Sequence, residues 1–351
     1  MIHILLLKIK LAVQPLKLLL LWITMSLILS CHSTVENEKT PEYALAIHGG
    51  AGTMDKSAMD DITAQKYHQS LNRALSIGDS VLLNGGTSLE AVEQVIRFME
   101  DDSLFNAGKG AVFTHEGKNE LDASVMTGHD MKAGAIAGVT TIKNPISAAR
   151  LVMEKSQHVF MTGQGAEKFA SDNGIELVDP KYFYTTARWQ SLQNILSKDN
   201  KKTELSEDEK GQKKHGTVGC VALDKYGNLS AGTSTGGMTN KRYNRVGDAP
   251  VIGAGTYADN NTCAISCTGH GEYFIRYTVA RSVAALMEYK DYSIEKAADE
   301  IIMQKLKPIG GEGGLIGIDN KGNIAMPFNT SGMYRGYCKN GIKKTFIYQN
   351  E

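Results

Sequence analysis

The first half of the chain combines one short apolar run with several stretches at helical spacing. Residues 43–47 are apolar and predict a strand, and His-Gly-Gly-Ala-Gly at 48–52 predicts a sharp turn directly after it. Apolar residues recurring every three or four positions predict helices over residues 63–83, 88–99, 145–155, 165–172 and 184–196. This half therefore indicates an α+β or layered α/β arrangement.

The second half has the pattern of a strand-rich layer that carries helices. Short apolar runs at residues 218–223 and 229–233 flank a Gly-Asn pair and predict a hairpin. The same reasoning pairs residues 315–318 with 324–326, and 251–257 with 262–267. Helical spacing predicts helices over residues 272–289 and 293–306.

A highly charged stretch separates the two halves. Residues 197–214 hold eleven charged residues in eighteen and a single large apolar residue, Leu205. Burial cannot offset the entropy lost on ordering such a stretch, which predicts a mobile linker over about residues 197–216. A solvated helix is the alternative, because Glu and Lys are good helix formers.

Composition narrows the class of protein. The 351 residues allow one large or two modest domains, each with a buried core. The 38 Lys and Arg balance 38 Asp and Glu, which leaves none of the excess basic charge that nucleic-acid binding requires. The 36 glycines follow no collagen repeat, so we assign them to turns and close backbone approaches. We therefore expect a folded protein that binds no nucleic acid.

Residues 1–30 have the layout of a secretory signal. They carry three Lys, no acidic residue and an apolar run at 18–29, followed by Ser30 and Cys31. The Ser-Cys junction resembles the bacterial lipobox. It predicts removal of residues 1–30, lipidation of Cys31, and export to a bacterial membrane, on the periplasmic side or at the cell surface. A permanent transmembrane helix is the alternative, although the apolar run is short for one.

The remaining cysteines have no metal-ligand spacing. They are Cys220, Cys263, Cys267 and Cys338, and Cys263 and Cys267 would share one face of a predicted strand. We interpret all four as small core residues, with disulfides as the alternative in an exported protein.

The charged linker ends abruptly at His215-Gly216-Thr217, where a buried strand is predicted to start. Cleavage before Thr217 would give a free N-terminal threonine, whose α-amino group has a pKa of about 7.7–8.0 and can act as base for its own hydroxyl. Gly216, with no Cβ, permits the crowded conformation that such a cleavage needs. The simpler interpretation is that Thr217 is an ordinary β-branched strand residue.

Motifs spread along the chain favour the cleavage hypothesis. They are His-Gly-Gly-Ala-Gly at 48–52, Leu-Phe-Asn-Ala-Gly at 104–108, Gly-Thr-Val-Gly at 216–219, Thr-Ser-Thr-Gly-Gly-Met-Thr at 233–239, Arg-Val-Gly-Asp at 245–248 and Thr-Gly-His-Gly-Glu at 268–272. In order and spacing, from about residue 43 to 336, they strongly resemble the isoaspartyl peptidase/L-asparaginase family of threonine-type N-terminal nucleophile hydrolases.

The resemblance implies an αββα sandwich and autoproteolysis between Gly216 and Thr217. It divides the chain into an α subunit at residues 31–216, ending in the mobile linker, and a β subunit at residues 217–351, which together form one domain. It also implies a dimer of two such αβ units.

The resemblance also assigns roles to individual residues. Thr217 is the nucleophile, Thr235 supports its hydroxyl, Thr268 and Gly269 form the oxyanion hole, Arg245 and Asp248 bind the α-carboxylate and α-amino group of an aspartyl unit together with Gly269 and Gly271, and Asn106 lies beside the site. The charges agree with these roles, since a guanidinium binds a carboxylate and a carboxylate binds an ammonium. A surface ion pair is the simpler interpretation of Arg245 and Asp248.

No cofactor for catalysis is expected. By resemblance, the backbone carbonyls of a loop bind a structural sodium ion; its residues are Met99, Glu100, Asp102, Phe105, Ala107 and Lys109. We interpret the side chains of Glu100, Asp101 and Asp102 as a solvated acidic cluster. The histidines His115, His129, His215 and His270 lack the spacing of zinc ligands.

The implied activity is hydrolysis of the β-amide of L-asparagine and β-aspartyl dipeptides, giving L-aspartate plus ammonia or an amino acid. Two alternatives remain open at the level of the sequence. One is a glycosylasparaginase, which acts on asparagine-linked sugar with the same nucleophile and clamp. The other is a lipid-anchored protein that binds amino acids through Arg245 and Asp248 and does not cleave itself.

Overall fold

The computed structural model describes residues 43–54, 56, 59–199, 216–349 and 351. Cys31 and the predicted signal at residues 1–30 lie outside the described residues, as do residues 200–215 of the predicted linker. The last helix before this gap continues to Asp199, so the first three residues assigned to the linker are helical.

The larger of two sheets combines strands from before the gap with strands from after it. Its strand order is β12-β11-β1-β5-β6-β2-β3-β4. The strands are β1 (Ala44–Gly52), β2 (Leu121–Thr127), β3 (Ala133–Val139), β4 (Phe160–Thr162), β5 (Val218–Leu223), β6 (Leu229–Thr235), β11 (Gly332–Lys339) and β12 (Ile342–Tyr348). Neighbours are antiparallel except for the parallel pair β3 and β4.

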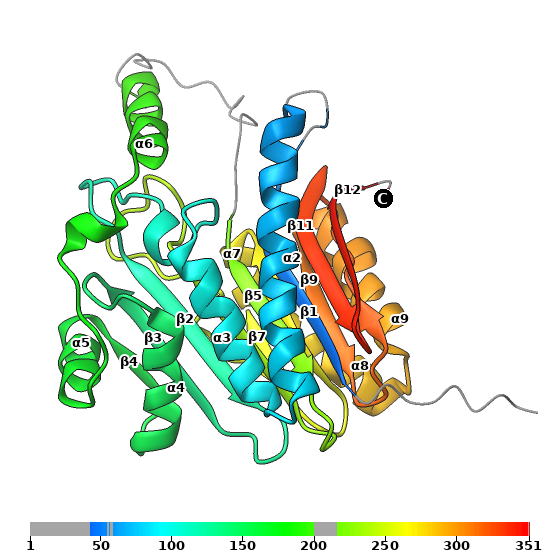
Figure 1. Ribbon diagram of the computed structural model, residues 1–351. Helices are drawn as coiled ribbons and strands as arrows, with labels where there is room; N and C mark the ends of the chain where they lie inside the picture. Colours follow the sequence, from blue (N-terminus) through cyan, green and yellow to red (C-terminus); the bar gives the residue numbers. More distant parts are fainter. Residues whose placement is uncertain (1–42, 55, 57–58, 200–215, 350) are drawn as a thin grey trace, which may run out of the picture. The chain divides into compact units, whose positions relative to one another are not determined.

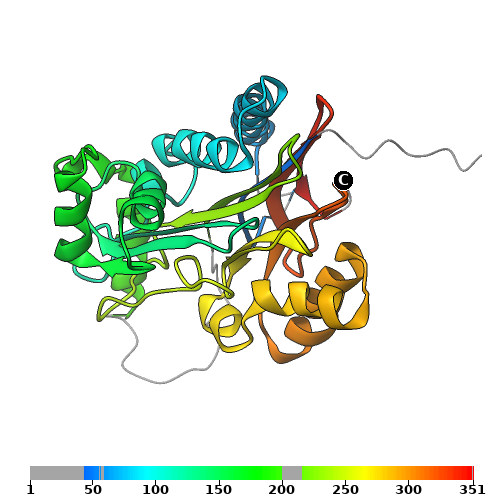
Figure 2. The same ribbon diagram turned by 90° about the horizontal axis from the view of Figure 1, so that it is seen from below.

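The smaller sheet packs face to face against the larger one, and helices cover the outer face of each (Figure 1, Figure 2). Its order is β10-β9-β8-β7, with strands β7 (Thr256–Ala258), β8 (Cys263–Gly269), β9 (Gly313–Asp319) and β10 (Ile324–Ala325). The predicted αββα sandwich is therefore confirmed.

The helices divide between the two outer faces. Those on the larger sheet are α2 (Asp61–Leu83), α3 (Ser88–Asp101), α4 (Pro145–Lys155) and α5 (Gly163–Asp172). Those near the smaller sheet are α7 (Gly271–Arg276), α8 (Val279–Lys290), α9 (Ile294–Asp299) and the π-helix η3 (Glu300–Leu306). The others are α6 (Thr186–Asp199) and the short 3₁₀ turns η1 (Gly108–Gly110), η2 (Pro180–Phe183) and η4 (Lys307–Ile309).

Strand β1 shows why both faces of the large sheet are buried. Successive side chains of a strand point to opposite faces, and here both sets are apolar. Leu45 and Ile47 belong to the core under α2 and α3, whereas Ala44 and Ala46 belong to the core between the two sheets. The small alanines leave room for the second sheet to approach.

Three local predictions need correction. Residues 48–52 do not form a turn: β1 continues to Gly52 and absorbs the glycines as a bulge between His48 and Gly50, where Gly50 has φ +111°. The helix predicted at residues 272–289 is two helices, because Thr278 adopts φ +44° between α7 and α8. The strand predicted at 251–257 is reduced to β7.

The predicted hairpins are present as the antiparallel pairs β5–β6, β9–β10 and β7–β8. Cys220, Cys263, Cys267 and Cys338 are buried free thiols, as predicted. Over the part of the chain that the structure describes, we find no helix with the length and apolar character to cross a membrane.

Candidate active site

Thr217 lies at the entrance to β5, between strands from both halves of the chain. The residue is only 9% exposed. The hydroxyl lies 2.8 Å from the carbonyl oxygen of Gly216 and 3.1 Å from the hydroxyl of Thr235 on the neighbouring strand β6. The predicted nucleophile, its supporting threonine and the carbonyl before it are therefore in direct contact.

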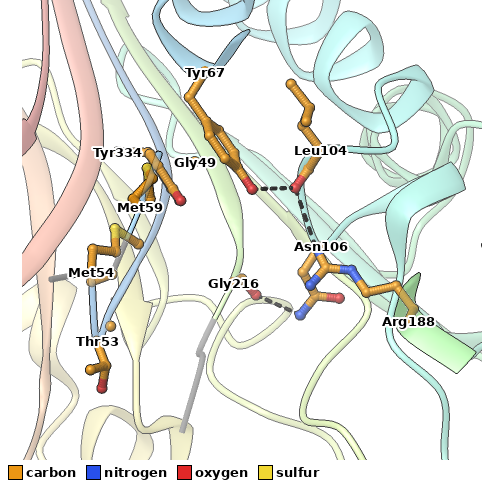
Figure 3. Close-up of a pocket in the computed structure, with 12 residues that line it drawn as sticks. Gly49, Thr53, Met54, Met59, Tyr67, Leu104, Asn106, Arg188, Gly216 and Tyr334 are labelled. Atoms are coloured by element: carbon orange, nitrogen blue, oxygen red, sulfur yellow. Dashed lines mark hydrogen bonds between the residues drawn. The ribbon is translucent and has the colours of Figure 1, made fainter. Parts of the chain in front are cut away.

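The carbonyl oxygen of Gly216 accepts hydrogen bonds from more than one side. The Asn106 side-chain amide donates to it at 2.8 Å (Figure 3). The Thr235 hydroxyl lies 3.2 Å from it. Each hydroxyl has a single proton. If Thr235 donates to Gly216, Thr217 can donate to Thr235, whose oxygen also accepts from the Gly237 amide at 3.0 Å. In this arrangement, two donors face the oxygen that becomes negative when the carbonyl is attacked.

Asn106 is held in place by its other contacts. Its Oδ1 accepts from the amide of Val112 at 2.9 Å, and its Nδ2 also donates to the carbonyl of Gly237 at 2.8 Å. A Cβ at position 216 would lie 2.6 Å from the Cβ of Asn106. Glycine is therefore required at position 216 for this approach.

Replacing Asn106 by Ala is expected to slow cleavage of the chain by about 10²- to 10³-fold, because one donor to the Gly216 carbonyl is lost. The appearance of fragments on denaturing gels over time measures the rate. Asn119→Ala is the matched control, since buried Asn119 binds the carbonyls of Ala111 and Val112 in the same loop. Equal slowing in both variants would assign Asn106 to holding the loop instead.

His48 is a site residue that the sequence indicated only as part of a motif. Its Nδ1 lies 3.1 Å from the Thr217 carbonyl, which can only accept, so Nδ1 carries the proton. Its Nε2 lies 3.0 Å from the hydroxyl of Ser266. Complete burial lowers the pKa of His48 to about 3, against a smaller opposing effect of the bond to Thr217. His48 is thus a neutral positioning residue and not a base.

Arg245 has an acidic partner that the sequence reasoning did not single out. Its Nε and Nη2 donate to the two carboxylate oxygens of Glu272 at 2.9 and 2.8 Å, and His270 lies 3.3 Å from the same carboxylate. This pairing uses one edge of the guanidinium. The edge formed by Nη1 and Nη2 keeps donors for a second carboxylate.

Asp248 is buried beside Arg245 and has a carboxylate oxygen that can accept hydrogen bonds from a cationic group. Among the described residues, its Oδ2 has no hydrogen-bond partner. Burial raises the pKa of Asp248 to about 7, although Arg245 opposes this shift. A Cβ at Gly271 would lie 2.6 Å from Nη2 of Arg245 and 3.1 Å from Oδ1 of Asp248. Gly271 therefore leaves space for a ligand at both charged groups.

One cavity brings most of the predicted site residues together. Its lining consists of Gly216, Thr217, Thr235, Gly237, Met238, Arg245, Gly247, Asp248 and Gly269. Its volume is about 20 Å³, room for little more than a water molecule while the chain is intact. Thr268 and Gly271 adjoin the lining residues without contributing to it.

Thr268 is buried at the end of β8, and its hydroxyl accepts a bond from the amide of Ala51 at 3.3 Å. That contact uses a lone pair and leaves the hydroxyl proton available. The predicted role of Thr268 as an oxyanion donor is compatible with this geometry.

The segment predicted to bind sodium begins in the last turn of α3 and continues into the loop after it. The prediction of a solvated acidic cluster there is wrong for Glu100, which is fully buried and accepts from the hydroxyl of Ser234 at 2.7 Å and the amide of Ile146 at 2.9 Å. Burial raises its pKa to about 8. His215 lies outside the described residues, and the described ones contain no group of three His, Cys, Asp or Glu side chains that could hold a metal ion.

Comparison with known proteins identifies relatives over most of the chain. The family model described as asparaginase matches residues 41–347. The chain is 49% identical over 313 residues to an isoaspartyl peptidase of Escherichia coli, covering 88% of this chain and 96% of the relative. It is 48% identical to an isoaspartyl peptidase of Salmonella typhimurium (84% and 94% covered) and 39% identical to a human isoaspartyl peptidase/L-asparaginase (85% and 93%).

The prediction of an exported protein anchored to a bacterial membrane by a lipid on Cys31 is wrong by this comparison. The two bacterial relatives are named isoaspartyl peptidases, with neither export nor a lipid anchor in the name. The prediction depended on residues 1–31, which lie outside both the described residues and the matched region. A basic, apolar stretch ending in Ser-Cys is a short pattern that carries little specificity.

The matched region contains the cavity that Thr217, Thr235, Arg245 and Asp248 line together. Its fold is the αββα sandwich of the N-terminal nucleophile hydrolases, and no catalytic cofactor is associated with this family. Together, the match and the fold identify the chain as a hydrolase. The chain belongs to the asparaginase family.

Proposed function

We propose that this chain cleaves itself between Gly216 and Thr217 and then hydrolyses the β-amide of L-asparagine and of β-aspartyl dipeptides. The products are L-aspartate and either ammonia or an amino acid. One observation carries the proposal: Thr217, Arg245 and the buried Asp248 line the same cavity.

The self-cleavage begins with attack of the Thr217 hydroxyl oxygen on the carbonyl carbon of Gly216. Asn106 and Thr235 donate to the resulting oxyanion. The C–N bond then breaks, the hydroxyl proton passes to the nitrogen of Thr217, and the chain is joined by an ester. Water opens the ester to give the carboxylate of Gly216 and a Thr217 with a free amino group and hydroxyl.

The same hydroxyl then attacks the substrate. Arg245 binds the α-carboxylate through its unpaired edge, and Asp248 binds the α-ammonium, which places the β-carbonyl near Thr217. The α-amino group of Thr217 takes the hydroxyl proton and passes it to the leaving amine. Thr268 and Gly269 donate to the oxyanion. Water, activated by the amino group, then releases aspartate from the ester.

The two alternative functions are less well supported. The relatives quoted above are named isoaspartyl peptidases or asparaginases, which does not favour a glycosylasparaginase. A protein that only binds amino acids has no need for the contacts of Thr217, Thr235 and Asn106 with the carbonyl of Gly216.

Kinetics on the purified protein test the proposal. Asparagine and β-aspartyl-leucine should be hydrolysed, and N-acetyl-asparagine should be refused because Asp248 has no ammonium to bind. A preference for asparagine-linked sugar would instead indicate a glycosylasparaginase. A single intact band that binds asparagine without hydrolysis would indicate the binding protein.

We also propose a structural sodium ion in the loop from Met99 to Lys109. Backbone carbonyls approach the glycines of this segment closely: a Cβ at Gly108 would clash with the carbonyl oxygen of Glu100, and one at Gly110 would clash with that of Phe105. Replacing sodium by choline in the buffer should then lower the thermal unfolding temperature. An unchanged temperature would contradict the proposal.

The same family resemblance also leads us to propose that the protein forms a dimer of two αβ units.

A further inference from the structure

A second cavity adjoins the catalytic one and shares a residue with it. Gly216 lines both cavities, and Asn106, which binds the Gly216 carbonyl, lines the second (Figure 3). The second cavity has a volume of about 100 Å³. Once the bond between Gly216 and Thr217 is cut, the two cavities can connect at the position of Gly216.

The walls of the second cavity are more apolar than polar. Side chains from four separate parts of the chain contribute, namely Met54, Met59, Tyr67, Leu104 and Tyr334. The rings of Tyr67 and Tyr334 stack with centroids 3.9 Å apart, and the Tyr67 hydroxyl donates to the carbonyl of Leu104 at 3.3 Å. Because these contacts fix the rings, the cavity presents a preformed apolar surface to a ligand.

Arg188 supplies a positive charge to this apolar cavity. Its Nε donates to the carbonyl of Gly110 at 2.9 Å and its Nη2 to that of Leu104 at 3.3 Å, which leaves three of the five guanidinium N–H donors. No acidic side chain in the described part of the chain forms an ion pair with it, and burial lowers its pKa. A charge withdrawn from water without a counter-charge is costly, so an anionic ligand would be favoured here.

The rest of the site determines which part of a substrate reaches Arg188. Arg245 and Asp248 hold the aspartyl unit on one side of Thr217. The leaving amine therefore points away from them, toward the position of Gly216 and the second cavity. In a β-aspartyl dipeptide, that amine belongs to an amino acid whose α-carboxylate is one carbon away. Free asparagine has no such carboxylate.

We propose that Arg188 binds the α-carboxylate of the leaving amino acid of a β-aspartyl dipeptide, while the apolar walls accept its side chain. This inference rests on the proposed function and deepens it, because it selects dipeptides with a free C-terminus and an apolar second residue. Trp189, next to Arg188 on α6, packs edge-on against Phe113 with ring centroids 5.2 Å apart. That contact holds the start of α6 in place independently of the bond that is cut.

The test compares three substrates with the processed enzyme and its Arg188→Met variant. They are β-aspartyl-leucine, the same dipeptide with a C-terminal amide, and asparagine. The variant should lower the ratio of kcat/KM for β-aspartyl-leucine to that for asparagine by about 10- to 100-fold, as expected for loss of a hydrogen bond between charged groups. The effect should be mainly on KM. Exposed Arg97 on α3 gives the control, Arg97→Met, which should leave the ratio unchanged.

Each outcome decides one claim. With the unmutated enzyme, the amide should be a poorer substrate than the free acid, and Arg188→Met should remove most of that difference. If the variant loses asparagine and dipeptide hydrolysis equally, Arg188 only holds the loop of Leu104 and Gly110, and the inference is overturned. If the unmutated enzyme hydrolyses asparagine but no dipeptide, the inference also fails. If it hydrolyses neither, the proposed function itself fails.

Discussion

Replacing Thr217 by Ala is expected to leave the chain in one piece and to abolish hydrolysis. A methyl group cannot attack the Gly216 carbonyl, and the hydroxyl that now lies 2.8 Å from that carbonyl oxygen is gone. Loss of a nucleophile costs about 10⁴-fold or more in rate, so activity should fall to the detection limit. Denaturing gels measure the cleavage and release of ammonia from asparagine measures the activity.

Two conservative variants provide the control. Thr217→Ser and Thr217→Cys keep a nucleophilic atom at the same position and should cleave at least slowly. The smaller fragment of the unmutated protein must begin Thr-Val-Gly-Cys. A different N-terminus, or cleavage of the Thr217→Ala chain, would place the nucleophile elsewhere.

Replacing Arg245 by Ala should separate maturation from turnover. The guanidinium makes no contact with Gly216 or Thr217 among the hydrogen bonds of the described residues, so cleavage of the chain should continue. The affinity for substrate should fall strongly, because the α-carboxylate enters a buried site without its cationic partner. Losing one member of a buried charged pair costs roughly 2–5 kcal/mol, which is about 30- to several-thousand-fold in kcat/KM.

Arg281→Ala is the matched control, since Arg281 also pairs with a glutamate, Glu288, at 2.6 Å but lies outside the catalytic cavity. Near-normal turnover in Arg245→Ala would show that the clamp is misassigned. A failure to cleave would show instead that Arg245 and Glu272 support the fold around Thr217.

The sequence predicted the parts of this molecule whose signals are local. Hairpins with Gly-Asn turns and the capped helix α3, where Thr87 and Glu90 form a capping box, follow from neighbouring residues alone. Strand β3, Ala-Gly-Ala-Ile-Ala-Gly-Val, was missed because its small residues have low strand propensity and gain their stability from burial on both faces. Its conformation depends on partners that are distant in sequence.

The site residues likewise fall into two groups, those with a local sequence signal and those without one. Thr217, Arg245 and Asp248 lie in recognisable motifs, but the contacts of His48 with the Thr217 carbonyl and Ser266 join residues 169 and 218 positions apart. Arg188 had no local signal at all, since its importance comes from a cavity whose walls are spread from Gly49 to Tyr334. Such residues are found only once the fold brings them together.

The order of strands in the large sheet has a consequence for the lifetime of the processed enzyme. Strand β1 precedes the proposed cut and is hydrogen-bonded on its two edges to β5 and β11, which follow the cut (Figure 1). Strand β2, also before the cut, is hydrogen-bonded on one edge to β6, which follows it. The two proposed fragments would thus be interleaved within one sheet, and neither could leave without breaking the other's core. Once unfolded, they would have to find each other by diffusion and insert a central strand. The proposed processing would therefore convert a reversible folding equilibrium into kinetic stability, in which the unfolding rate alone limits how long the enzyme survives heating.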